Sequence, residues 1–152
     1  VDFDSEAFLE RTSELFHEIE EKDGIPLLPY AKEILEYLKP RYRLALASST
    51  RGPTVERQLR AAGVIDFFEP RTPGERVEHS KPSPEIYLMA CKYIGMKPEE
   101  CVAIEDSLNG IRSAHAAGLH PIMVIDKVQP TDEIRGMCEA VFESLEEVKT
   151  IL

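Results

Sequence analysis

Apolar residues recur along this chain with two different spacings. In several segments they lie three or four positions apart, as on the buried face of an amphipathic helix. Between these segments lie short runs of mostly apolar residues, which are typical of buried parallel strands. The pattern predicts helices over residues 5–22, 30–39, 53–62, 84–94, 107–117 and 144–152, and strands over 42–47, 65–69, 101–104 and 121–125.

Glycine and proline mark the ends of most predicted helices. The residues that follow them are Gly24, Pro40, Gly63, Gly95 and Gly118. A single helix separates each pair of successive predicted strands. Parallel neighbours need such crossover connections, so the pattern predicts an α/β fold in which a parallel sheet is flanked by helices on both faces.

Composition and charge narrow the class of protein. The chain has 152 residues, of which 43% are hydrophobic and 30% charged, as in a globular protein with its own core. Its net charge of -10 would repel a phosphate backbone, so we expect no nucleic-acid partner. No apolar run approaches the roughly 18 residues of a membrane-spanning helix, and no signal-peptide pattern occurs. We therefore expect a cytoplasmic protein without a membrane partner, and we expect it to be a monomer.

Two predicted strands end in polar residues that could bind a ligand. The first runs into Ser48, Ser49 and Thr50, whose hydroxyls and amides could hold a phosphate group or could form only a turn and a helix cap. The third runs into Glu105 and Asp106, which could ligate a divalent cation such as Mg²⁺ or could favour the start of the next helix. Because ligands bind at the carboxyl ends of parallel strands, both positions are candidate sites.

Lys81 lies just before the predicted helix over 84–94, where the helix dipole is already positive. A bound anion would favour a lysine there; the alternative is a solvated loop residue. Lys81 follows Ser48 by 33 residues and precedes Asp106 by 25, each about one strand–helix unit. We therefore expect the first, third and fourth predicted strands to be parallel neighbours, with Ser48, Lys81 and Asp106 facing one cleft.

Three segments carry these residues and resemble the motifs of one enzyme family. They are LALASST at 44–50, SKPSPEIY at 80–87 and IEDSLNGI at 104–111. In order and spacing they resemble the second, third and fourth motifs of the haloacid dehalogenase-like phosphotransferases, in particular the branch of beta-phosphoglucomutase-like phosphatases. The resemblance covers the chain from about residue 24 onward and implies a Rossmann-like parallel sheet flanked by helices.

The resemblance also implies a role for each candidate residue. Ser48 would hydrogen-bond the transferring phosphoryl group, and Lys81 would neutralise that group and the nucleophile. Glu105 and Asp106 would hold Mg²⁺. Three further residues would line the phosphate side of the pocket: Ser49, Thr50 and Arg51.

The implied reaction is a phosphoryl transfer to an aspartate. The aspartate would attack a small phosphorylated metabolite, such as a sugar phosphate, and water would then hydrolyse the aspartyl phosphate. Two other functions stay open. A beta-phosphoglucomutase-type isomerase would use the same residues, and a non-catalytic phosphate-binding or interaction module would keep the pocket without a nucleophile.

The first motif of the family has no full counterpart in this sequence. It consists of an apolar strand followed by D-x-D-G, in which the first aspartate attacks phosphorus and the second acts as general acid and base. The nearest candidates are Asp2 and Asp4, but only Val1 precedes them, and Ser5 stands in place of the glycine. We expect Asp4 or Ser5 to cap the first helix instead.

This departure suggests how the chain is divided into domains. We expect residues 1–24 to be the remnant of a helical cap domain and residues 25–152 to be the core domain without its first strand. Tyr30 follows the linker between them, at a place where such linkers often carry glycine. The lacking strand would adjoin the strands that end at Ala47 and Ile104, and without it we expect this chain to be inactive.

Overall fold

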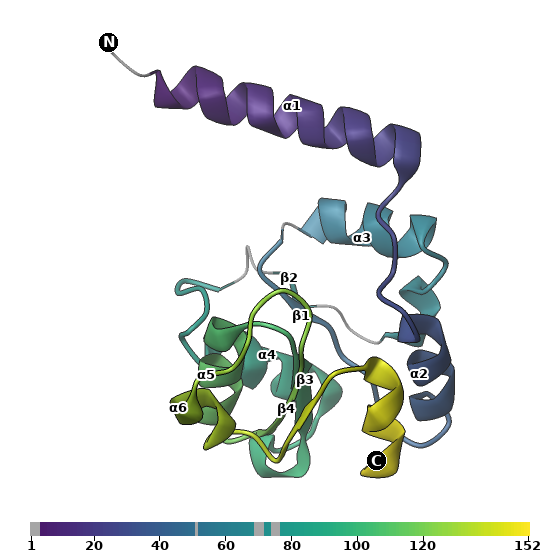
Figure 1. The fold of residues 1–152 in the computed structure, drawn as a ribbon, viewed down its shortest axis with the longest axis vertical. Coiled ribbons are helices and arrows are strands. Elements are labelled where there is room, and N and C mark those ends of the chain that lie inside the picture. Colours follow the sequence, from purple (N-terminus) through teal and green to yellow (C-terminus); the bar gives the residue numbers. More distant parts are fainter. Residues whose placement is uncertain (1–3, 51, 69–71, 74–76) are drawn as a thin grey trace.

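The computed structural model describes residues 4–50, 52–68, 72–73 and 77–152, and helices and strands alternate along them (Figure 1). The helices are α1 Ser5–Asp23, α2 Ala31–Leu38, α3 Gly52–Ala61, α4 Glu85–Ile94, α5 Leu108–Ala116 and α6 Asp132–Arg135, with 3₁₀ helices η1 Ile65–Phe67, η3 Pro98–Glu100 and η4 Leu145–Thr150. The strands are β1 Ala47–Ser48, β2 Thr72–Pro73, β3 Val102–Glu105, β4 His120–Val124 and β5 Ala140–Phe142.

The described strands form two parallel sheets. One contains β3, β4 and β5 in that order, with Ile104 opposite Ile122 and Ile122 opposite Ala140. The other contains β1 and β2, with Ala47 opposite Thr72. The prediction that the third and fourth predicted strands are parallel neighbours is confirmed.

The prediction that the first predicted strand pairs beside β3 is wrong. Within the described residues only its last position, Ala47, belongs to a ladder, and that ladder is with β2. Apolar packing nevertheless joins the two sheets. Ala47 of β1 and Ala103 of β3 pack in one cluster with Ile86 and Tyr87 of α4.

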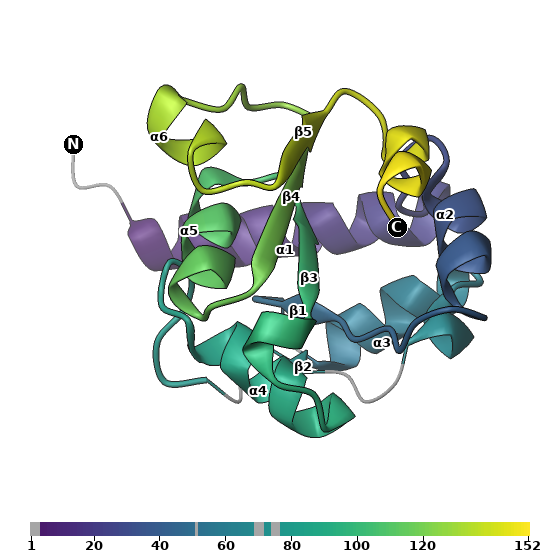
Figure 2. The ribbon, with the colours of Figure 1, turned by 90° about the horizontal axis from the view of Figure 1, so that it is seen from below.

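Helices cover both faces of the larger sheet, as the alternation of helices and strands predicts. On one face, α2 and η4 pack on β4 through Ile34, Leu38, Val124 and Val148. On the other face lie α4, α5 and α6 (Figure 2). Because both faces are buried, neighbouring residues of one strand serve different cores, and the strand reads as a continuous apolar run.

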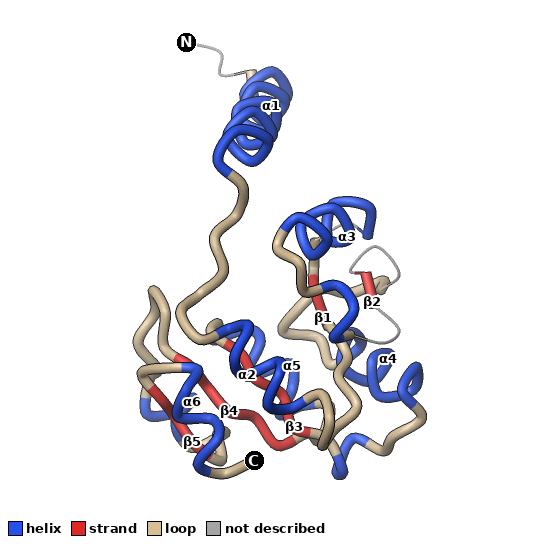
Figure 3. The backbone as a smooth tube through the Cα atoms, turned by 90° about the vertical axis from the view of Figure 1, so that its right-hand side faces the viewer, coloured by secondary structure: helices blue, strands red, loops and turns tan. Residues whose placement is uncertain are grey.

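The α1 helix stands apart from the rest of the chain (Figures 1 and 3). The side chain of Asp4 accepts hydrogen bonds from the backbone N–H groups of Glu6 and Ala7, so the prediction that Asp4 caps this helix is confirmed. Asp2 lies outside the described residues. An ion pair of 2.6 Å between Arg57 and Glu20 links α3 to α1. The domain boundary after residue 24 stays a prediction.

The predicted strand over 65–69 is wrong, because Ile65–Phe67 form the 3₁₀ helix η1. Val64 and Ile65 are both buried. A short apolar run is compatible with a buried strand or with a single helical turn, so its composition does not distinguish the two. The sequence pattern does not predict the short elements β2, α6 and β5, and the last predicted helix is the 3₁₀ helix η4. Within the described ranges, no helix combines the length and apolar character needed to cross a membrane.

Tyr30, at the start of α2, has the left-handed backbone conformation that glycine adopts most easily, with φ of 64°. A Cβ in this conformation costs about 1–2 kcal/mol. We expect the free energy of unfolding, measured in urea, to be about 1 kcal/mol higher for Tyr30→Gly than for Tyr30→Ala, because only alanine keeps the Cβ. Equal stability of the two variants would contradict this account.

Candidate functional site

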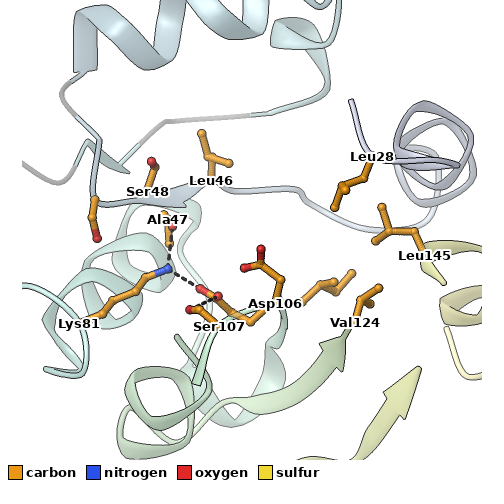
Figure 4. Close-up of a pocket in the computed structure, with 12 residues that line it drawn as sticks. Leu28, Leu46, Ala47, Ser48, Lys81, Asp106, Ser107, Val124 and Leu145 are labelled. Atoms are coloured by element: carbon orange, nitrogen blue, oxygen red, sulfur yellow. Dashed lines mark hydrogen bonds and ion pairs between the residues drawn. The ribbon is translucent and has the colours of Figure 1, made fainter. Parts of the chain in front are cut away.

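A cavity of about 470 Å³ opens where β1 and β3 end, within the size range of small-molecule sites (Figure 4). One half of its lining is polar and the other half is apolar. The polar lining residues are Ser48, Ser49, Lys81, Glu105, Asp106 and Ser107. The apolar ones are Leu28, Leu46, Ala47, Ile104, Val124 and Leu145. The structure therefore brings Ser48, Lys81 and Asp106 to one cleft, as the sequence predicts.

Lys81 connects the ends of the two sheets. Its Nζ donates a hydrogen bond of 3.3 Å to the carbonyl oxygen of Ala47 in β1 and forms an ion pair with the Glu105 carboxylate at the end of β3. The side chains of Lys81 and Glu105 are only 15% and 8% exposed. A lysine so poorly hydrated needs a partner, and Glu105 is that partner within the chain. Lys81 is thus not a solvated loop residue.

The Glu105 carboxylate accepts hydrogen bonds from three neighbouring side chains. Oε1 accepts from Lys81 and from the Tyr87 hydroxyl, and Oε2 accepts from the Ser107 hydroxyl at 3.1 Å. Gly110 leaves room for it, because a Cβ at that position would lie 2.0 Å from Oε2. Both carboxylate oxygens of Glu105 therefore accept hydrogen bonds. The Glu105 side chain packs against Gly110, which has no Cβ.

Tyr87 is buried, and burial raises the pKa of its hydroxyl far above the usual value, with the negative charge of Glu105 adding to the effect. The hydroxyl therefore stays protonated at neutral pH. A protonated hydroxyl can donate, as the contact with Glu105 requires.

Asp106 differs from its neighbour Glu105 in its surroundings. It is exposed, lines the cavity and extends into the space between the two sheets (Figure 4). None of the described residues donates a hydrogen bond to its carboxylate. Ser107 caps α5 by accepting a hydrogen bond of 3.0 Å from the Gly110 N–H, so this segment also begins the next helix. The Asp106 carboxylate is therefore available to ligate a divalent cation.

The serines after β1 form a turn at the cavity wall. The Ser48 hydroxyl oxygen accepts a hydrogen bond of 3.1 Å from the Thr50 N–H, so the turn expected as one alternative is present. Ser48 and Ser49 also line the cavity. Thr50 is not among the residues that line this cavity, and its role at a bound phosphate stays a prediction. Arg51 lies outside the described residues.

Three hydrogen bonds fix the loop that carries Lys81, and the sequence pattern predicts none of them. The carboxylate of Glu85, the first residue of α4, accepts from the N–H groups of Glu78 at 2.6 Å and His79 at 2.9 Å, and these bonds lower its pKa. The buried Ser113 hydroxyl of α5 donates to the Ser83 carbonyl at 2.5 Å. The loop is therefore tied at both ends to the helices that pack on β3.

Replacing Gly110 by alanine should disturb this site. The added Cβ would displace the Glu105 carboxylate from its donors, so we expect the free energy of unfolding in urea to fall by about 1–3 kcal/mol. Gly136→Ala is the control, because its Cβ would lie 3.4 Å from the nearest atom, the Glu133 carbonyl oxygen. Alanine favours helices more than glycine does, so a stable Gly110→Ala variant would show that Glu105 is not held as described.

The sequence of this chain is similar to those of known hydrolases and phosphatases. The family description of haloacid dehalogenase-like hydrolases matches residues 1–118. Hexitol phosphatase A of Escherichia coli is 35% identical over 133 residues, which are 86% of this chain and 60% of that protein. The phosphorylated carbohydrates phosphatase of Thermotoga maritima is 37% identical over 95 residues, which are 62% of this chain and 44% of that protein.

The fold is also found among solved structures. CbbY from Rhodobacter sphaeroides in complex with phosphate superposes with a TM-score of 0.80 at 33% identity, over 93% of this chain and 65% of that one. The chain spans about half the length of the curated relatives that it matches.

Proposed function

The chain belongs to the haloacid dehalogenase-like hydrolase family, and we propose that it forms the core of an Mg²⁺-dependent phosphatase for small phosphorylated carbohydrates. The observation that carries this proposal is the cavity that joins the Lys81 ammonium, the Ser48 hydroxyl and the Asp106 carboxylate. Two relatives, named hexitol phosphatase A and phosphorylated carbohydrates phosphatase, support this substrate class. Because both are named as phosphatases, they also favour hydrolysis over isomerisation.

Lys81 is the residue that neutralises the phosphoryl group in this proposal. Its ammonium has three N–H donors, of which Ala47 and Glu105 take two. The third is left for a ligand in the cavity. A positive group that is fixed before the reaction begins stabilises a phosphoryl-transfer transition state without any rearrangement of the site. Its effect is strongest where bulk water is excluded.

The polar half of the cavity has suitable ligands for Mg²⁺. This ion prefers oxygen ligands, commonly binds one or two carboxylates and keeps several waters. Asp106 would bind it, and Glu105, whose two oxygens already accept hydrogen bonds, would support the site through water. The ion, when bound, would neutralise the charge that develops on the transferring phosphoryl group.

The nucleophile in this proposal is an aspartate on a strand that lies between β1 and β3. The support is geometric. Glu105 is already hydrogen-bonded, and Asp4 caps α1. Within the described residues, β1 pairs only with β2 and β3 only with β4, so each has an edge that a further parallel strand could join. The apolar half of the cavity suits the side chains of such a strand.

The reaction would proceed in two displacements. The aspartate oxygen forms a bond to phosphorus while the bond from phosphorus to the sugar oxygen breaks, and that oxygen takes a proton from the second aspartate of the D-x-D motif. Water then attacks the aspartyl phosphate and releases inorganic phosphate and the free aspartate. Lys81 and Ser48 would hold the phosphoryl oxygens through both steps.

Asp106→Asn tests the cation site. Losing the free carboxylate should weaken Mg²⁺ binding, measured by calorimetry, by about tenfold or more, and should lower turnover of the active enzyme by on the order of 100-fold. Asp126→Asn is the matched control, since Asp126 also lies on the surface just after a strand but does not line the cavity. Unchanged Mg²⁺ affinity in Asp106→Asn would rule out this role.

An assay of residues 1–152 against sugar phosphates and an aryl phosphate, with Mg²⁺, tests the proposed origin of the nucleophile. We expect orthophosphate to bind and no ester to be hydrolysed, because no aspartate of the described cavity is placed to attack phosphorus. Turnover that Asp2→Asn or Asp4→Asn abolishes would show that the N-terminal segment supplies the nucleophile. Binding without turnover in every longer form of the protein would instead favour a phosphate-binding module.

A further inference from the structure

Tyr87 touches both members of the Lys81–Glu105 pair but does not line the cavity. We propose that Tyr87 is a positioning residue, which fixes the place of the Lys81 ammonium on the cavity wall by holding Glu105. The value of that placement for phosphate binding rests on the proposed function. The placement itself does not, and it can be tested separately.

The contacts of Tyr87 restrain the ion pair from two directions. Its hydroxyl donates at 2.5 Å to Oε1 of Glu105, the same oxygen that accepts from Lys81. Its ring centroid lies 5.2 Å from Lys81 Nζ, within the range of a cation–π contact. The ring packs among Ile86, Ala103 and Ala114, so the hydroxyl has little freedom to move.

A restraint of this kind matters because lysine is a flexible side chain. Its four-carbon stem can adopt many rotamers, and an ammonium has no directional preference of its own. Glu105 defines where Nζ lies only as long as Glu105 is itself fixed. Ser107 holds Oε2, and Tyr87 is the neutral donor that holds Oε1.

The same restraint gives the two adjacent acids different tasks. Held by Tyr87 and Ser107, Glu105 stays turned toward Lys81, while Asp106 stays free to face the cavity. Without the Tyr87 hydroxyl, Glu105 could rotate toward the cavity, and Lys81 would follow its partner. The Lys81 ammonium would then no longer have a fixed position on the cavity wall.

Tyr87→Phe tests this directly, because it removes the hydroxyl and keeps the ring that fills the core. Tyr37→Phe is the matched control: its hydroxyl also makes one hydrogen bond, to the Leu152 carbonyl at 3.1 Å. The first measurement is the rate at which acetic anhydride acetylates Lys81 in the folded protein, followed by peptide mass spectrometry. Lys92, an exposed lysine on α4, provides the internal reference.

We expect Tyr87→Phe to raise the acetylation rate of Lys81 relative to Lys92 about fivefold or more, because the ammonium leaves its partner more often. We expect Tyr37→Phe to leave that ratio within about twofold of the native value. An unchanged ratio in Tyr87→Phe, or an equal rise in both variants, would overturn the inference.

The second measurement is the affinity for orthophosphate in the presence of Mg²⁺. Tyr87→Phe should weaken it about tenfold, as expected for the loss of one hydrogen bond to a charged group, while Tyr37→Phe should bind as the native chain does. If the native chain binds no orthophosphate, the proposed function fails, and the acetylation ratio still decides whether Tyr87 positions Lys81. Raised reactivity with unchanged phosphate affinity would overturn the functional part of the inference.

Discussion

A lysine and a glutamate with little access to solvent join the two sheets of this protein. Lys81 reaches Ala47 at the end of β1 and Glu105 at the end of β3, although the described strands β1 and β3 share no ladder. Taking two charges out of water is costly, and their attraction offsets that cost only when further hydrogen bonds complete the pair. Tyr87 and Ser107 supply those bonds, so the site depends on buried side chains as much as on those that face the cavity.

The chemistry available to the cavity follows from how this pair is held. Because Glu105 is occupied by Lys81, Tyr87 and Ser107, the adjacent Asp106 is the carboxylate left for a cation. Lys81 keeps one donor for an anionic ligand, and Ser48 adds a hydroxyl from the end of β1. A positive group, a hydroxyl and a free carboxylate on one polar wall form a suitable site for a phosphate ester together with Mg²⁺.

Much of this site could be predicted from the sequence, because parallel strands end at one edge of a sheet. Polar residues that follow apolar runs were therefore expected to meet, and Ser48, Lys81 and Asp106 do so. The partner of β1 could not be predicted, because apolar composition says that a strand is buried but not which strand lies beside it. The roles of Tyr87 and Gly110 were also hidden, since a buried tyrosine and a helical glycine look like ordinary core residues until their contact with Glu105 is seen.

A crystal structure of the protein grown with Mg²⁺ and orthophosphate would show whether Lys81, Ser48 and Asp106 form one ligand site. We expect phosphate within hydrogen-bond distance of Lys81 Nζ and Ser48 Oγ, Mg²⁺ on the Asp106 carboxylate, and Glu105 still hydrogen-bonded to Tyr87. Phosphate bound away from Lys81, or Lys81 turned out of its contact with Glu105, would contradict this expectation.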